Sequence, residues 1–166
     1  MIKKLDLKDP DTAFRILELQ TVSYSIEARM INFYGIPPLK DTIESLFCCD
    51  ELFYGYYIEE RLAGLISYNQ IDALIDICRL AIHPEVFRRG IAASLIDFVM
   101  NISSVTNRVI VSTGKNNVPA VNLYLNKGFN IVRDREIATG IYITEFEKVL
   151  MIPKPKNTLG EDLSKK

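Results

Sequence analysis

The sequence predicts an α/β (α+β) fold: a mixed, mostly antiparallel central sheet with one parallel strand pair and helices on both faces. Two observations carry this prediction. Several short runs rich in Val, Ile, Tyr and Phe alternate with polar residues between turn signals, which is typical of strands. A strand-like run at 75–82 is followed by a helix-like stretch and a second β-branched run at 108–113, so a right-handed crossover would make these two strands parallel.

The first third of the chain is expected to be mainly helical. Residues 1–7 alternate as a short edge strand would. Residues 9–11 (Asp-Pro-Asp) form a helix start, because Asp is a favoured N-cap and Pro is tolerated in the first turn. Helical spacing continues to residue 33, where the breaker sequence at 35–38 ends it, and Asp41 is expected to open a second short helix.

The middle of the chain predicts an antiparallel meander and then the crossover. Alternation over 53–59 and 62–68 around a polar turn indicates a hairpin, and 71–82 supplies the next strand. After Gly90, apolar residues recur at helical spacing as far as 102, which predicts an amphipathic helix.

The last third predicts a helix and two strands. The helix is expected over 119–127, with Gly128 as its C-cap. The final strands are expected at 129–133 and 141–150.

Composition bounds the class of protein. The 166 residues, 48% hydrophobic and 25% charged, fit one globular domain, expected over 1–152 with a polar tail at 153–166. The net charge of −1 gives no broad basic field, so no nucleic-acid partner is expected. There is neither an apolar run of about 18 residues nor a charged-then-apolar leader, so no membrane association is expected and the cytoplasm is the default location. Three cysteines without metal spacing and one histidine predict no metal site.

The turn before the crossover helix has an unusual charge. Arg88 and Arg89 stand where a helix N-terminus presents unpaired N–H groups and a positive dipole end. With Gly90 permitting close backbone approach, the turn predicts an anion site suited to a pyrophosphate, and Glu85 is expected to offset one arginine. The competing interpretation is that both arginines are solvated and Gly90 relieves strain. One glycine excludes a P-loop and a dinucleotide fingerprint, which need several.

Two segments resemble motifs of the GNAT family of N-acetyltransferases. Residues 87–92 (FRRGIA) are similar to the family's cofactor motif of Gln or Arg, two residues, Gly, one residue, then Gly or Ala, except that Phe87 replaces the first polar residue. Residues 117–129 (NVPAVNLYLNKGF) resemble a later motif, in which an Asn precedes a helix bearing Ala and Tyr and ending in Gly-Phe. The two motifs occur in the family's order, and the resemblance covers residues 1–150.

The resemblance implies acetyl-CoA as co-substrate and no metal. In the family a gap between two parallel strands holds the pantetheine arm, which implies a splayed pair formed by 75–82 and 108–113. Backbone amides at 87–92 would hold the pyrophosphate, and an amide near Leu80 or Ala81 would stabilise the oxyanion. The implied cofactor-binding residues are Leu80, Ala81, Ile82, Phe87, Arg88, Arg89, Gly90, Ile91, Ala92, Asn117 and Tyr124.

Asp76 is the first candidate for the base that deprotonates an amine acceptor. By strand alternation it shares a face with Cys78, Leu80 and Ile82, and a carboxylate in an apolar run needs a partner or a function. The alternative is an ion pair with Arg79 or a solvated strand end.

The family often has a glutamate where Cys78 stands, which leaves other bases open. One is a water relay from Asp76, and another is a carboxylate from the variable N-terminal region, such as Glu27. A covalent route through Cys78 is disfavoured, because a buried strand cysteine has no evident base or cation to form its thiolate.

The remaining site residues come from the helices and the N-terminal region. By resemblance, Tyr124 is the general acid to the departing thiolate, and its alternative is an aromatic core anchor. Asn117 would hold the cofactor or a nearby water, while a helix N-cap is the simpler interpretation and compatible with it. Tyr24, Glu27 and Tyr34 are expected to line the acceptor pocket, and the alternative for the tyrosines is a core position with a solvated hydroxyl.

These inferences predict an acetyl-CoA-dependent N-acetyltransferase that transfers acetyl to a primary amine by direct attack in a ternary complex. The acceptor is expected to be a small-molecule or peptide amine, and a homodimer is left open. One alternative is a catalytically silent acyl-CoA-binding regulatory or scaffold module, which the cysteine at position 78 favours. Another is a plain nucleotide binder.

Overall fold

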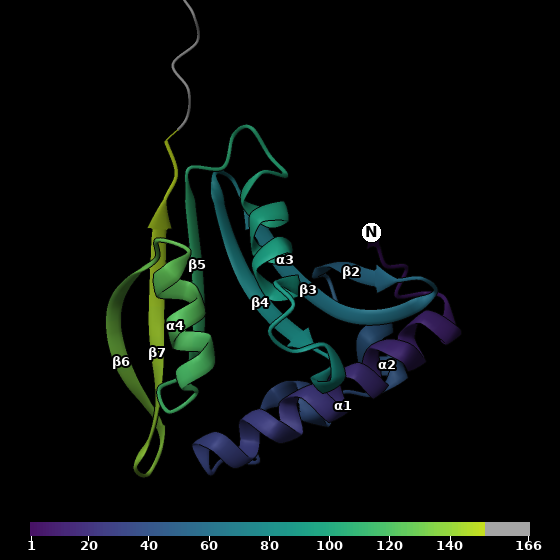
Figure 1. Ribbon diagram of the computed structural model, residues 1–166, viewed down its shortest axis with the longest axis horizontal. Helices are drawn as coiled ribbons and strands as arrows, with labels where there is room; N and C mark the ends of the chain where they lie inside the picture. The colour runs from purple at the N-terminus through teal and green to yellow at the C-terminus, as the bar shows by residue number, and fades with distance from the viewer. Residues whose placement is uncertain (152–166) are drawn as a thin grey trace, which may run out of the picture.

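The computed structural model describes residues 1–151 and has one seven-stranded sheet flanked by helices, which confirms the predicted fold class (Figure 1). The strand order is β1-β2-β3-β4-β5-β7-β6, in which β4 and β5 are parallel and the other neighbours are antiparallel. The strands are β1 (Ile2–Lys4), β2 (Leu52–Ile58), β3 (Arg61–Ile71), β4 (Leu74–Ile82), β5 (Arg108–Gly114), β6 (Asn130–Ala138) and β7 (Ile141–Val149). The helices are α1 (Pro10–Ile31), α2 (Ile43–Phe47), α3 (Ile91–Met100) and α4 (Val118–Asn126), with short 3-10 turns η1 (Pro37–Lys40) and η2 (Pro84–Val86). The tail predicted at 153–166 lies outside the described residues.

Local sequence signals account for most helix ends. The Asp9 side chain accepts a hydrogen bond from the Thr12 amide and caps α1 as predicted. Gly128 follows α4 with φ of 80°, the left-handed conformation that glycine adopts without strain. The predicted start of α2 at Asp41 is wrong by one residue: Thr42 forms a capping box with Ser45. The strand predicted at 129–133 extends to Ala138, paired with β7.

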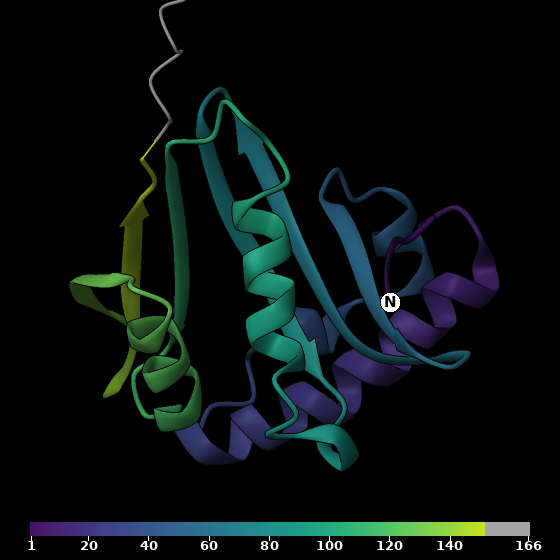
Figure 2. The ribbon, with the colours of Figure 1, turned by 45° about the horizontal axis from the view of Figure 1, so that its top comes forward.

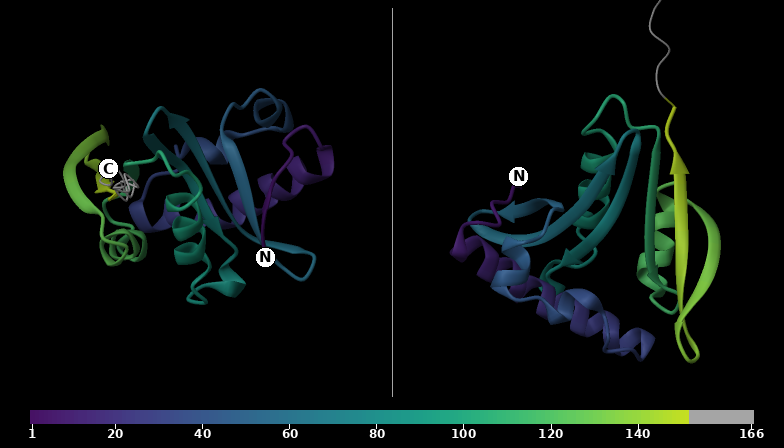
Figure 3. Two further views of the ribbon diagram at one scale, coloured as in Figure 1. Left: turned by 90° about the horizontal axis from the view of Figure 1, so that it is seen from above. Right: turned by 180° about the vertical axis from the view of Figure 1, so that it is seen from behind.

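The helices form two layers on opposite faces of the sheet (Figure 2). One core lies between the sheet and α3 with α4, and it includes Ile75, Leu95 and Phe146. The other lies between the sheet and α1 with α2, and it includes Ile16 and Leu46. The two views in Figure 3 show α1 running across the end of the sheet toward which β4 and β5 separate. Within residues 1–151 no helix is both long and apolar enough to span a membrane.

A β-bulge in β4 corrects the predicted facing of its side chains. Arg79 pairs with Ser67 and Ile77 pairs with Tyr68, so Cys78 is an extra residue in the ladder. Beyond the bulge the alternation is inverted, and Leu80 and Ile82 pack with Ile75 and Ile77 against α3. The prediction that Asp76 shares a face with Leu80 and Ile82 is therefore wrong, because alternation holds only while the ladder is regular.

The parallel strand pair opens at the same bulge. Hydrogen-bonded pairing of β4 with β5 runs from Leu74 opposite Arg108 to Ile77 opposite Val111 and stops there. The remainder of β5 continues along β7, whereas the remainder of β4 continues along β3. The strands consequently separate toward the end of the sheet that α1 crosses (Figure 1).

Candidate active site

Two adjoining cavities lie where β4 and β5 separate. The first, which we call the gap cavity, has a volume of about 310 Å³ between residues 77–80 of β4, residues 111–114 of β5, α1 and the loop at 36–38. The second, which we call the turn cavity, has a volume of about 550 Å³ between the N-terminus of α3, the end of β4, α1 and α4. Glu27, Leu80, Asn117 and Ala120 line both cavities, so the two meet at these side chains.

Hydroxyl groups from α1 satisfy backbone donors that the separation of the strands leaves unpaired. The Leu80 amide donates to the Tyr24 hydroxyl at 3.2 Å, and the Ile82 amide donates to Ser23 Oγ at 3.2 Å. Backbone N–H groups that are removed from solvent need such acceptors, because an unpaired donor costs free energy. Tyr24 is buried, and burial, followed by the nearby charge of Glu27, raises its pKa, so its hydroxyl keeps its proton.

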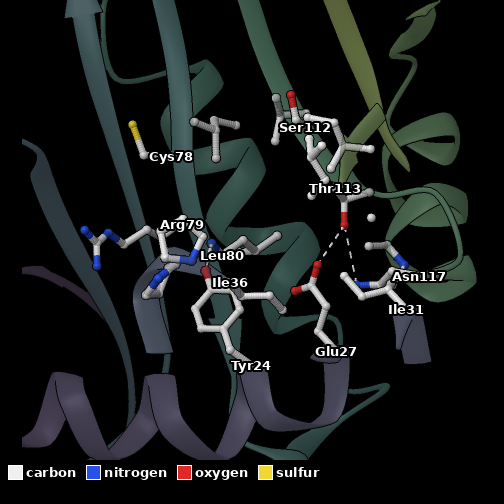
Figure 4. Close-up of a pocket in the computed structure, with 18 of the residues that line it drawn as sticks. Tyr24, Glu27, Ile31, Ile36, Cys78, Arg79, Leu80, Ser112, Thr113 and Asn117 are labelled. Atoms are coloured by element: carbon white, nitrogen blue, oxygen red, sulfur yellow. Dashed lines mark hydrogen bonds between the residues drawn. The ribbon is translucent and has the colours of Figure 1, made fainter. Parts of the chain in front are cut away.

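Glu27 reaches from α1 toward β5 at the junction of the cavities (Figure 4). Thr113 Oγ1 donates to Glu27 Oε1 at 3.4 Å, and Asn117 Nδ2 donates to Thr113 Oγ1 at 3.5 Å. Burial raises the pKa of the Glu27 carboxyl more than hydrogen bonds from Asn117, the Gly114 amide and Thr113 lower it. A carboxylate in this environment is a stronger base than an exposed one.

Tyr124 approaches the gap cavity from α4. Its ring is 3% exposed and packs against Phe129 and Phe146, with ring centroids 5.6 and 5.3 Å away. Burial and the Glu27 charge raise the pKa of its phenol, so the hydroxyl keeps its proton at neutral pH. The hydroxyl makes no hydrogen bond within residues 1–151. The core interpretation of the ring and the catalytic interpretation of the hydroxyl are therefore compatible.

The turn before α3 presents unpaired amides to the turn cavity. Gly90 is the N-cap with φ of 76°, and no side chain caps the helix or places a negative charge in its first turn. A Cβ built at Gly90 meets nothing within 4 Å, so the space above these amides is open. Arg88, with φ of 63°, lines the cavity, whereas Arg89 does not. The expectation that Glu85 offsets one of these arginines is wrong, because Glu85 pairs with Arg61 at 2.6 Å.

Arg79 holds the outer wall of the gap cavity through a part-buried network. Its guanidinium binds Asp41 and Glu51, and Nη1 also donates to Gln20 Oε1 at 3.0 Å. The ion pair between Arg79 and Asp76 considered from sequence does not form, because Arg79 is engaged by these partners on the other side of the bulge. Asp76 lines neither cavity, and burial and the Glu51 charge raise its pKa.

Cys78 is solvent-exposed, which corrects the expectation that it is buried. Its sulfur lies on β4 and points away from Glu27 (Figure 4). Desolvation along the strand and the charges of Glu51 and Asp76 raise the pKa of the thiol to about 12. The thiolate is consequently scarce at neutral pH, which argues against a covalent cysteine route as the sequence did.

The structure gathers most of the residues selected from sequence. The gap cavity is lined by Tyr24, Glu27, Leu80, Asn117 and Tyr124, and the turn cavity by Glu27, Leu80, Ile82, Phe87, Arg88, Gly90, Ile91, Ala92 and Asn117. Asp76, Ala81, Arg89 and Tyr34 line neither, and Tyr34 is 65% exposed. Asn117 is also the N-cap of α4, where it accepts from the Ala120 amide.

Sequence reasoning missed Ser23 and Thr113. Ser23 gave no signal, because its role depends on the unpaired edge of β4. Thr113, a polar residue at the end of a β-branched strand predicted to border the gap, was identifiable in principle.

Within residues 1–151, no three His, Cys, Asp or Glu side chains gather as a metal site would require.

Comparison with known proteins gives a consistent result. The model of the acetyltransferase (GNAT) family matches residues 15–129. The streptothricin acetyltransferase of Escherichia coli is 33% identical over 128 residues, which are 74% of each chain. The UPF0157 protein YqkA of Bacillus subtilis is 35% identical over 156 residues, and the present chain, of which 94% aligns, spans 45% of its length.

A solved structure shows the same fold. The ribosomal-protein-S18-alanine N-acetyltransferase from Escherichia coli superposes with a TM-score of 0.73, covering 97% of this chain and 99% of that one at 12% identity.

Proposed function

The chain belongs to the GNAT acetyltransferase family, and on that premise we propose that residues 1–152 form an acetyl-CoA-dependent N-acetyltransferase domain acting on a primary amine. Membership of this family supports acetyl transfer as the general reaction and acetyl-CoA as the acetyl donor. The observation that carries the finer proposal is the junction of the two cavities at Glu27, Leu80 and Asn117. An amine in one cavity and a thioester in the other would meet there, as direct attack in a ternary complex requires.

The turn cavity fits a coenzyme A diphosphate. The uncapped amides of Ile91 and Ala92, the open space above Gly90 and the cationic Arg88 are the groups that an anion needs. Leu80 and Ile82, on the free edge of β4, would hold the arm that leads into the gap. Bound there, the co-substrate supplies the activated acyl group, and the chain's own residues orient it and exclude water.

The gap cavity supports a cationic acceptor. Its one cation, within the described residues, is Arg79, and this guanidinium is occupied by Asp41 and Glu51. No free cation lines the cavity to bind a carboxylate or phosphate of an acceptor, whereas Glu27 and Glu51 favour an ammonium group. Similarity to an enzyme named for streptothricin makes that compound the first acceptor to test.

A thermal-shift panel tests the co-substrate. Acetyl-CoA and CoA at 100 times their dissociation constants should each stabilise the fold by about 2.7 kcal/mol, while ATP and NAD should act weakly. Stabilisation by ATP or NAD without any by CoA would contradict the proposal.

An acceptor screen separates the enzyme from a silent acyl-CoA-binding module. The panel comprises streptothricin, aminoglycosides, polyamines, amino acids and peptide N-termini, each assayed for release of free CoA thiol. Turnover with cationic amines is expected. Tight CoA binding without turnover on any member would favour the silent module. Against that module stands the half-buried carboxylate of Glu27, which offers a candidate base where Cys78 does not.

A further inference from the structure

The carboxylate of Glu27 occupies a position that no other carboxylate of the described chain shares. It lines both cavities, whereas Glu51 lines only the gap cavity and Asp76 lines neither. Glu51 is held by Arg79 at 2.9 Å and by Ser67, so its charge is already paired with a fixed cation. Glu27 makes no ion pair within residues 1–151, and its hydrogen bond from Thr113 is long at 3.4 Å. A bound ammonium would therefore meet a carboxylate with acceptor capacity left.

The groups around Glu27 shift its pKa without neutralising its charge. Tyr24 packs from α1, Thr113 and the Gly114 amide from β5, and Asn117 and Tyr124 from α4. All are uncharged at neutral pH, since burial raises the pKa of both phenols. The cation of the neighbouring strand, Arg79, is engaged by Asp41 and Glu51. Burial thus dominates, and it raises the pKa of Glu27 from its ordinary value of 4.5.

We propose that Glu27 is the general base that takes a proton from the acceptor ammonium at the junction of the two cavities. This role rests on the proposed acetyltransferase function. It assigns the base to α1, in place of Asp76 on β4. The position four residues before the end of α1 matters, because the helix crosses the open end of the β4–β5 gap there and directs the side chain into it (Figure 4).

The reaction moves one proton to solvent, forms a C–N bond and breaks a C–S bond. Glu27 removes one proton from R–NH₃⁺ and gives it to solvent. The free amine forms a C–N bond with the thioester carbonyl carbon, and the C–S bond breaks. Tyr124 donates its proton to the leaving sulfur and regains one as the nitrogen loses its second proton. The products are R–NH–acetyl and the free thiol of CoA.

The decisive comparison is Glu27→Gln against Glu18→Gln, an exposed glutamate on the same helix. With acetyl-CoA and streptothricin, or the fastest acceptor of the screen, Glu27→Gln should lower kcat/KM by about 10² to 10⁴ and remove the acidic limb of its pH profile. Glu18→Gln should keep both. The dissociation constant for CoA, measured by calorimetry, should change less than threefold in either variant. Glu27→Asp, which withdraws the carboxylate by one methylene, should retain the limb at a reduced rate.

Stability against pH provides a readout that needs no turnover. Because folding raises the pKa of Glu27, its neutral form is favoured in the folded state, and this contribution is lost as pH rises through the folded-state pKa. The melting temperature of Glu27→Gln should match the wild type below pH 4.5 and exceed it increasingly at higher pH. A lower melting temperature at pH 7 to 8 would show that Glu27 is a structural anchor for Thr113 and overturn the proposal.

Two further outcomes separate failure of the base from failure of the function. If the wild type turns over and Glu27→Gln keeps its rate and acidic limb, or Asp76→Asn loses them instead, Glu27 is not the base while the acetyltransferase stands. If the wild type binds no CoA and acetylates no amine of the panel, the acetyltransferase proposal and the base both fall.

Discussion

At the scale of single residues, the Tyr124 hydroxyl is the group whose removal tests leaving-group protonation most cleanly. It makes no hydrogen bond within residues 1–151, so Tyr124→Phe leaves no partner unsatisfied and keeps the ring contacts with Phe129 and Phe146. We expect unfolding free energy and CoA affinity to stay nearly unchanged. A positioned general acid contributes about 10² to 10⁴ in rate, and a thiolate leaves readily, so kcat should fall about a hundredfold. An unchanged kcat, with chemistry shown to limit by single-turnover kinetics, would leave Tyr124 as a core residue.

Substitution of Ser23 tests whether α1 supplies a hydrogen-bond acceptor to the β4 edge that bound CoA would otherwise supply. Ser23→Ala removes the acceptor of the Ile82 amide and should lower the unfolding free energy of the ligand-free protein by about 1 to 2 kcal/mol. If the CoA arm binds this edge, saturating CoA restores a partner to the amide, and the deficit measured by denaturant titration should shrink. Ser25→Ala, a neighbour on α1 without a side-chain hydrogen bond in the described structure, is the matched control. A deficit of equal size with and without CoA would contradict this arrangement.

At the scale of elements, the α3 N-terminus allows two adjacent arginines to be compared. Arg88 lines the turn cavity and Arg89 does not, so Arg88→Glu should weaken CoA binding by tenfold or more and Arg89→Glu should have a smaller effect. The Arg88 effect should decrease with rising salt, because the group is exposed. Calorimetry with CoA and dephospho-CoA would show which phosphate is involved. Equal losses for both variants would indicate a general field and not a contact.

The sequence predicted the elements well and their fine register poorly. Periodicity located β4, β5 and α3, since each has a continuous apolar pattern, and the Asp9 and Gly128 caps carry their own local chemistry. The bulge at Cys78 has no such signal, because it arises from how β3 and β4 pair across space. One extra residue inverts the facing of everything beyond it. The base was therefore sought at Asp76, whereas the geometry favours Glu27, a residue on a helix distant in sequence.

At the scale of the whole molecule, the open gap depends on how α1, η1 and α2 are tied to the sheet. These contacts converge on Arg79, which donates hydrogen bonds to Gln20 on α1 and to two carboxylates. Asp41 lies between η1 and α2, and Glu51 directly precedes β2. Its guanidinium also lies over the Phe53 ring, 5.3 Å from the centroid. The network fixes the wall of the gap cavity opposite Glu27, so its loss should disturb stability and acceptor binding together.

Replacing the central cation should therefore be costly. Arg79→Met leaves Asp41 and Glu51 as neighbouring part-buried anions without their partner, and breaking such a pair costs about 3 kcal/mol. Removing the whole charge set should be milder, because no part-buried charge is then left without its partner. The triple variant Arg79→Met, Asp41→Asn, Glu51→Gln should regain at least half of the lost unfolding free energy. Arg15→Met, at an exposed site on α1, should stay within about 0.5 kcal/mol of the wild type and is the control.

The triple variant also separates stability from specificity. The triple variant has no charges in this network but side chains of similar volume, so the wall of the gap cavity should keep its shape and CoA affinity should be unchanged. Because Glu51 lines the gap cavity, its neutralisation should raise KM for a cationic acceptor more than it lowers kcat. Urea titration and steady-state kinetics on the same protein measure both effects. An Arg79→Met variant as stable as the wild type, or a triple variant no more stable than the single one, would show that the network does not hold the gap open.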